Sequence, residues 1–317
     1  MKIDIKGSEM ILTITLNPAI DISYKIDKLA INTVNRCDDI IKTSGGKGLN
    51  VTRVISLLGE RVCATGFLGG PNGQYIGDDL KQNLIPNDFQ RISGETRNCI
   101  AILHEGNQTE ILEDGPIISE NEKIQFLRKY QELLKKSDIV VASGSLPKGL
   151  GNEFYGQLVY LANKSGSKFL LDCSGEALKK ALVYQPYLIK PNKEEISSLL
   201  DLEIGTEENL IDALKSMKKY KIPYIVVSLG EDGALALVGE VIYKVTIPKV
   251  KAVNPVGSGD STMAGFSIAV ENNFSIEKTL KLGCVLGTLN AMEEKTGYVD
   301  KAKIEEFLEM TYVEILK

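Results

Sequence analysis

The residues best placed to do chemistry stand in one short motif, residues 254–261, which reads N-P-V-G-S-G-D-S. A β-type segment at 241–250 precedes this glycine turn, and Asp260 opens an apolar run of small residues that is typical of a helix. Glycines allow successive backbone N–H groups to converge, and a helix N-terminus adds positive potential, so the motif favours an anion such as a phosphoryl group. A carboxylate there could take a proton from an attacking hydroxyl. The alternative is an ordinary turn in which Asp260 only caps the helix.

Further polar motifs directly follow predicted strands. In an open α/β sheet, ligands bind beyond the carboxyl ends of the strands, so residues that end different strands should meet at one edge. These motifs are Asp21 after the first strand, Gly45-Gly46-Lys47-Gly48 with Asn50 at a helix start, Ser143-Gly144-Ser145, Lys190-Pro191-Asn192-x-x-Glu195 and Ser228-x-Gly230-x-x-Gly233. Together with the Asp260 motif they predict a ligand site better than they fit a set of unrelated turns.

Two familiar nucleotide-binding motifs do not match this sequence. Lys47 is followed by glycine instead of serine or threonine, so the 45–48 loop departs from the phosphate-binding loop of P-loop NTPases. The 257–262 segment departs from the dinucleotide fingerprint G-x-G-x-x-G because residue 262 is threonine. A P-loop NTPase and an NAD-dependent dehydrogenase therefore both lose support.

His104 is the only histidine of the chain. Multi-histidine metal sites are therefore excluded, and a Ser-His-Asp triad would have to use this one residue. His104 lies in a strand-like region next to Glu105 and Gly106, a position that favours a structural role.

Charge and cysteine usage narrow the class of protein further. The 317 residues include 42 acidic and 37 basic ones, so the net charge of −5 argues against a nucleic-acid surface built on bulk charge. Five scattered cysteines without a C-x-x-C pair predict free thiols in the reducing cytoplasm. No apolar run has membrane-spanning length, and no signal peptide is visible, so we expect no membrane contact. The polar residues 1–9 are expected to be a leader or a short tail.

The order of predicted elements indicates an α/β protein. Strands and helices alternate from residue 120 onward, and strands such as 139–143 and 224–228 are near-continuous apolar runs, as expected when helices cover both sheet faces. We predict a doubly wound, mostly parallel sheet in a single domain, residues 10–317. Two β regions, about 20–43 and 96–113, do not fit the alternation and predict a small separate sheet. Residues 303–316 are expected to close the chain as a helix.

These motifs together resemble the ribokinase-like carbohydrate kinases, also called the phosphofructokinase B family. The resemblance covers essentially residues 10–317 and rests on T-S-G-G-K-G-L-N at 43–50 and N-P-V-G-S-G-D-S-T-M-A-G at 254–265. It implies a ribokinase-like doubly wound sheet with a small β lid that closes over the sugar and often forms a homodimer. It also implies ATP and Mg²⁺ as the nucleotide and the metal.

The resemblance implies a role for each matching residue. Asp260 would be the general base, and the amides of Gly257, Ser258 and Gly259 would form an anion hole for the γ-phosphoryl group. The sugar side would be lined by Asp21, Gly46, Asn50 and Ser145. The nucleotide side would be lined by Lys190, Asn192, Ser228, Gly230 and Gly233.

The metal role falls on the N-x-x-E element of the family, which Asn192 and Glu195 match; it would support magnesium through water. The neighbouring Glu194 is a rival for that role, or simply a solvated carboxylate in the first turn of a helix. One carboxylate and one amide suffice for Mg²⁺, because this ion keeps several waters.

Two cations on the sugar side indicate a substrate that already carries a phosphate. Arg97 and Lys47 are interpreted as its anchors, whereas Arg53 and Arg36 are interpreted as structural or surface residues. Within the family, segments such as G-E-T-R-N-C-I-A-I at 94–102 most resemble the tagatose-6-phosphate kinases of lactose and galactose catabolism, which make tagatose 1,6-bisphosphate from ATP. Fructose 1-phosphate and fructose 6-phosphate are the alternative substrates. A non-catalytic sensor on the same fold is a competing hypothesis.

Overall fold

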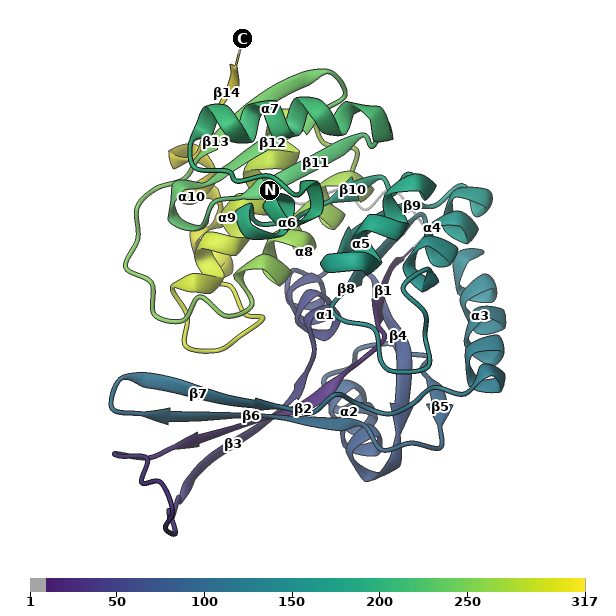
Figure 1. The fold of residues 1–317 in the computed structure, drawn as a ribbon, viewed down its shortest axis with the longest axis vertical. Helices are drawn as coiled ribbons and strands as arrows, with labels where there is room; N and C mark the ends of the chain where they lie inside the picture. Colours follow the sequence, from purple (N-terminus) through teal and green to yellow (C-terminus); the bar gives the residue numbers. More distant parts are fainter. Residues whose placement is uncertain (1–9, 317) are drawn as a thin grey trace.

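The core of the fold is one large sheet. The computed structural model describes residues 10–316, so the expected leader at 1–9 lies outside the described residues. The sheet has the strand order β14-β13-β12-β11-β10-β9-β8-β1-β4-β5 (Figure 1). The strands from β11 to β5 are parallel, and β12, β13 and β14 form an antiparallel edge. The bounds are β1 Ile11–Thr15, β4 Val62–Gly69, β5 Gln90–Ile92, β8 Ile139–Ser143, β9 Lys168–Asp172, β10 Leu188–Ile189, β11 Tyr224–Ser228, β12 Ala234–Val238, β13 Val241–Thr246 and β14 Tyr312–Leu316.

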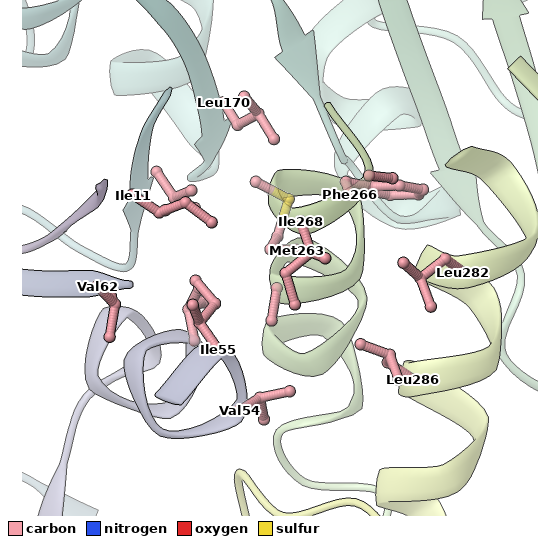
Figure 2. Packing of buried hydrophobic residues seen from close by; sticks show 14 of the residues in the cluster. Ile11, Val54, Ile55, Val62, Leu170, Met263, Phe266, Ile268, Leu282 and Leu286 are labelled. Atoms are coloured by element: carbon pink, nitrogen blue, oxygen red, sulfur yellow. The ribbon is translucent and has the colours of Figure 1, made fainter. Parts of the chain in front are cut away.

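Helices cover both faces of this sheet. Alternate residues of one strand point to opposite faces, so Ile139 and Val141 of β8 join one hydrophobic core while Val140 and Ala142 join the other. The first core packs against α1, α8 and α9 (Figure 2), and the second packs against α3, α4 and α7. The predicted doubly wound, mostly parallel sheet is therefore confirmed. The helices are α1 Lys47–Leu57, α2 Gly70–Gln82, α3 Glu120–Leu134, α4 Phe154–Ser165, α5 Gly175–Ala181, α6 Lys193–Leu200, α7 Glu207–Met217, α8 Ser258–Glu271, α9 Ile276–Ala291 and α10 Ile304–Met310.

A small second sheet projects from the main body (Figure 1). Its strand order is β3-β2-β6-β7, with bounds β2 Ala19–Lys25, β3 Asp39–Gly45, β6 Arg97–His104 and β7 Asn107–Leu112. The pairs β2–β3 and β6–β7 are antiparallel, whereas β2 and β6 are parallel. These strands come from the two β regions that did not fit the alternation of the main sheet, so the small separate sheet is confirmed.

The end of the chain differs from expectation. Residues 303–316 were predicted to form one helix, but α10 ends at Met310 and Tyr312–Leu316 forms β14, antiparallel to β13. The segment Y-V-E-I-L is rich in β-branched and aromatic residues, and β13 offers an edge with unpaired backbone groups, so pairing outweighs helix propensity there. Among the helices of residues 10–316, none is both long and apolar enough to cross a membrane.

Candidate active site

A cleft of about 2410 Å³ lies between the carboxyl ends of the parallel strands and the small sheet. It collects most of the residues that the sequence singled out, from segments far apart in the chain. Its lining includes Asp21, Gly46, Lys47, Asn50, Arg97, Ser145, Lys190, Asn192, Glu195, Ser228, Gly257, Gly259 and Asp260. In the described part of the chain, Ser258, Gly230 and Gly233 are not part of that lining.

Asp260 stands in the first turn of α8, directly beyond the glycine turn. Gly257 caps this helix with φ of 83°, a left-handed conformation that glycine adopts without steric cost. The Asp260 side chain is buried, and its Oδ2 accepts a hydrogen bond of 2.7 Å from Asn50 Nδ2. Burial and the nearby Asp172 raise the pKa of Asp260 to about 7, although the Asn50 hydrogen bond and two lysines lower it. A carboxyl group that titrates near neutrality suits a general base.

The backbone of the glycine turn offers several N–H groups to an anion. Gly259 and Asp260 belong to the first turn of α8, where N–H groups lack intrahelical partners. The Ser258 N–H instead donates to Pro255 O at 3.2 Å, and the Ser258 hydroxyl is buried without a hydrogen-bond partner. The ammonium group of Lys190 lies beside Gly259, 3.2 Å from where a Cβ of that residue would be. The N-terminus of α8 and the ammonium group of Lys190 therefore lie next to each other, where both can attract an anion.

Two lysines and three carboxylates make this end of the cleft highly charged. Lys190 is buried and pairs with Asp172, with 3.4 Å between Nζ and Oδ1. The pKa of Lys47 is raised, chiefly by Asp172 and further by Asp260 and Glu195, despite burial. Asp172 was not singled out from the sequence, although it ends strand β9 in the same way that other site residues end theirs. The position after a strand was thus the signal that could have found it.

Arg53 orients the residue that holds Asp260. Its guanidinium donates to the backbone oxygen of Ser44 and to Asn50 Oδ1. Because a guanidinium only donates, Asn50 must turn its oxygen toward Arg53 and its NH₂ group toward Asp260. Arg53 also lines the cleft, so it stands closer to the chemistry than the structural or surface role that the sequence indicated.

The small sheet contributes a further carboxylate to the cleft. Burial raises the pKa of Asp21 to about 6, while Arg53 and Arg97 lower it. The space for this carboxyl group exists because residue 45 is glycine: a Cβ there would lie 2.1 Å from the Asp21 side chain. Asp21 is thus placed where it can accept hydrogen bonds from hydroxyl groups of a ligand.

Arg97 marks a separate cationic part of the cleft. Its Nη1 donates to Glu113 O at 2.8 Å and its Nη2 to Asn17 O at 3.2 Å, and its Nε is buried without a partner. Arg97 acts electrostatically on Asp21, whereas Lys47 and Lys190 act on Asp260. The two cations that the sequence assigned to a substrate phosphate, Arg97 and Lys47, therefore belong to different groups of charges.

Among the residues that the sequence assigned to the nucleotide and the metal, Asn192 and Glu195 form the start of α6. Asn192 Oδ1 accepts from Glu195 N at 2.7 Å, and Glu195 Oε2 accepts from Asn192 N at 2.8 Å, which is a capping box. Ser228 forms an isolated parallel bridge with Asn192. Glu194 is exposed in the first turn of the helix. The glycines that follow, Gly230 and Gly233, have φ of 61° and 88° and shape the turn between β11 and β12.

The donor set at this end fits a magnesium ion. Mg²⁺ takes oxygen ligands and needs one or two protein carboxylates besides waters and substrate phosphates. The capping box uses Oε2 of Glu195 and leaves Oε1 for a ligand. Asp172 and Glu195 both act electrostatically on Lys47, so the two carboxylates belong to the same part of the cleft. Within residues 10–316, no group of three or more His, Cys, Asp or Glu side chains could hold a metal on its own. The nucleotide phosphates and water would therefore supply most of the coordination.

His104 lies outside this chemistry. It ends β6 in the small sheet, and its Nε2 lies 2.9 Å from Thr109 Oγ1. Its position agrees with the structural role predicted from the sequence.

Comparisons with known proteins agree with the arrangement of the cleft, because the matching proteins are carbohydrate kinases. The family model described as pfkB family carbohydrate kinase matches residues 10–302. A tagatose-6-phosphate kinase of Staphylococcus epidermidis is 47% identical over 310 residues, which is 96% of this chain and 100% of that protein. A putative phosphofructokinase of Staphylococcus aureus superposes with a TM-score of 0.85 at 31% identity, covering 97% of this chain and 99% of that one. Phosphofructokinase-2 of Escherichia coli in complex with fructose-6-phosphate superposes with a TM-score of 0.87 at 28% identity, covering 95% and 98%. The chain belongs to the pfkB family of carbohydrate kinases.

Proposed function

We propose that this carbohydrate kinase transfers the γ-phosphoryl group of ATP to the C1 hydroxyl of D-tagatose 6-phosphate, giving D-tagatose 1,6-bisphosphate and ADP. The observation that carries the proposal is the buried Asp260 with a pKa of about 7, which shares a cleft with the separate cation Arg97. A ketohexose phosphate has matching ends, a hydroxyl to be phosphorylated and a phosphate to be held. The identity of 47% to a protein named tagatose-6-phosphate kinase supports this sugar over others.

In the proposed reaction, the hydroxyl oxygen attacks the γ-phosphorus in line with the bond to ADP. Asp260 Oδ2 keeps its hydrogen bond from Asn50, so the other carboxylate oxygen is the one that accepts the hydroxyl proton. The first-turn N–H groups of Gly259 and Asp260 and the ammonium of Lys190 stabilise the charge that spreads over the γ-phosphoryl oxygens. The bond to the β-phosphate oxygen breaks as the new P–O bond forms.

The nucleotide and metal roles follow the lining of the cleft. Lys190, Asn192 and Ser228 are proposed to face the nucleotide, and the turn at Gly230 and Gly233 to shape that side. Asn192 and Glu195 are proposed to hold Mg²⁺ through water. When bound, this ion supplies positive charge that neutralises the β- and γ-phosphates.

Lys47 is proposed to bind the substrate at the transfer end. Because its ammonium group faces Asp172 and Asp260, Lys47→Met removes charge where the phosphoryl group moves. We expect kcat to fall by about 100-fold, with a smaller rise in the KM for the sugar phosphate. Steady-state kinetics measures both parameters. Lys193→Met is the control, because Lys193 is the first residue of α6 as Lys47 is the first residue of α1. A large rise in that KM at constant kcat would instead support the anchor role predicted from the sequence.

Asp21 is proposed to hold sugar hydroxyls, and its position depends on Gly45. A methyl group at residue 45 would lie 2.1 Å from the Asp21 carboxyl group, so Gly45→Ala must displace it. We expect the KM for the sugar phosphate to rise about tenfold or more, with the KM for ATP unchanged. Gly205→Ala is the matched control, because a Cβ there meets only Asn209 Oδ1 at 3.9 Å. An unaltered sugar KM in Gly45→Ala would remove Asp21 from the binding site.

The small sheet is proposed to act as a lid and as the interface of a homodimer in the cytoplasm. Its strands expose large apolar side chains, among them Ile40, Ile41, Ile111 and Leu112. Lid closure would exclude water from the transfer and limit hydrolysis of ATP. Light scattering of Ile40→Asp, a residue outside the lining of the cleft, tests the interface against the unchanged protein, since a dimer that persists at the same affinity would place it elsewhere.

The first experiment is an ADP-release assay with Mg-ATP on tagatose 6-phosphate, fructose 1-phosphate, fructose 6-phosphate and unphosphorylated tagatose. We expect the highest kcat/KM for tagatose 6-phosphate. A preference for fructose 1-phosphate would keep the mechanism and change the substrate, and equal activity on the neutral sugar would refute Arg97 as a phosphate anchor. No turnover of any sugar would favour a sensor.

A further inference from the structure

One unassigned side chain lies between Arg97, the proposed anchor of the substrate phosphate, and Ser145, which the sequence assigned to the sugar side. Asn17 stands two residues beyond the end of β1, is 6% exposed and lines the cleft. Its Nδ2 donates to Asp114 O and to Ser145 Oγ, each at 3.2 Å. Its backbone oxygen accepts from Arg97 Nη2, also at 3.2 Å. Asn17 therefore connects the cation and the hydroxyl of this part of the cleft.

The carbonyl of Asp114 fixes which way the Asn17 amide points. A carbonyl oxygen only accepts hydrogen bonds, so the NH₂ group of Asn17 must face it. The flipped amide would bring two acceptors together and leave the Asp114 carbonyl without this donor. In the orientation that remains, the same NH₂ group also faces Ser145 Oγ.

This orientation decides what the Ser145 hydroxyl can do. A hydroxyl has one hydrogen to donate, and the NH₂ group of an amide cannot accept it. Since Ser145 accepts from Asn17, its own hydrogen must point elsewhere, and no acceptor for it is found among residues 10–316. Ser145 is exposed in the cleft, so its hydrogen is free to donate to water or, in the occupied cleft, to a ligand.

We propose that Asn17 is a specificity-determining residue for the phosphate group of the substrate, acting as a positioning residue for Ser145. This inference rests on the proposed function. A phosphate dianion carries only acceptors, so it matches a site that presents the Arg97 guanidinium and a hydroxyl held as a donor.

The near-isosteric variant Asn17→Asp reverses this arrangement. Its carboxylate would accept the Ser145 hydrogen and place a negative charge beside the substrate phosphate. We expect the KM for tagatose 6-phosphate to rise about 10- to 100-fold, with kcat and the KM for ATP within about threefold of the unchanged protein. Asn152→Asp, which adds the same charge elsewhere in the lining of the cleft, is the control and should leave the sugar KM within about threefold.

A double-mutant cycle separates positioning from structure. Asn17→Ala should raise the sugar KM about tenfold alone and less than about threefold in a Ser145→Ala background, because its effect passes through that hydroxyl. Additive effects, or an unchanged KM in Asn17→Asp, would overturn the proposal.

Thermal shifts on adding tagatose 6-phosphate or neutral tagatose give a readout independent of turnover. In the Asn17 variants, only the shift with the phosphorylated sugar should be smaller than in the unchanged protein. If the unchanged protein turns over no sugar phosphate, the proposed function fails first; if it does and Asn17 variants match it, this inference fails alone.

Discussion

Asp260→Asn is expected to lower kcat by about 1,000-fold or more, while the affinity for ATP stays within a few-fold. The amide has the shape of the carboxylate and can still accept the hydrogen bond from Asn50 Nδ2, so the geometry of the α8 N-terminus is retained. What it lacks is a group that takes up a proton. Single-turnover kinetics with saturating sugar phosphate, combined with ATP titration by calorimetry, would measure both quantities.

The stability of the Asp260→Asn variant provides the control. The direction in which its stability differs from that of the unchanged protein follows from the pKa of Asp260. The pKa of Asp260 is about 3.8 in the unfolded chain and about 7 in the folded protein. Between these values the folded protein holds a proton that the unfolded chain has released, so the contribution of this group to the free energy of unfolding falls as pH rises, and levels off above about 7. Asp260→Asn removes this dependence. Its Tm should exceed that of the unchanged protein above pH 7, and the difference should shrink as the pH is lowered toward 4.

The same pKa predicts the pH dependence of catalysis. Only the ionised carboxylate accepts a proton, so kcat/KM should fall about tenfold per pH unit below about 7. A loss of ATP affinity as large as the loss of kcat in Asp260→Asn would assign the residue a structural role. A pH profile that stays flat between 5 and 7 would show that a different group takes the proton.

Local sequence patterns sufficed to predict the doubly wound fold and most of the residues that line the cleft. Buried strands, glycine turns and helix starts are short-range signals, and they correctly placed Asp260 at the start of α8 and the 45–48 loop at the start of α1. The strand-like end of the chain, β14, was missed because its pairing partner β13 lies about 70 residues earlier, and helix propensity alone does not record that partner.

The contacts that tune the site are long-range, and the sequence does not reveal them. Asn50 and Asp260 are separated by 210 positions, and Asn17 and Ser145 by 128, so neither hydrogen bond leaves a pattern in a short window. The role of Arg53 depends on the orientation of an amide, which only the folded protein determines. Asp172 is the exception, since its place at the end of a strand was visible in the sequence.

Arg97→Ala is expected to raise the KM for tagatose 6-phosphate by about 100-fold, because it removes the cation of this end of the cleft and its charge-assisted hydrogen bonds. The kcat should change only a few-fold, since Lys47 and Lys190, not Arg97, surround Asp260. Arg97→Lys keeps the charge and loses the planar guanidinium, so its KM for tagatose 6-phosphate should lie between that of the unchanged protein and that of Arg97→Ala. Steady-state kinetics on the phosphorylated and the neutral sugar would measure the selectivity directly.

Arg97 also donates to the backbone oxygens of Asn17 and Glu113, so a structural contribution has to be separated from phosphate binding. Both carbonyls lie in segments that join the small sheet to the main body, and their loss of a donor would affect every substrate equally. Phosphate binding, by contrast, affects only the phosphorylated sugar. The exposed Arg91, outside the lining of the cleft, gives the matched control Arg91→Ala. An equal loss on tagatose and tagatose 6-phosphate in Arg97→Ala would therefore assign Arg97 to the junction of the two sheets and leave the substrate phosphate without its proposed anchor.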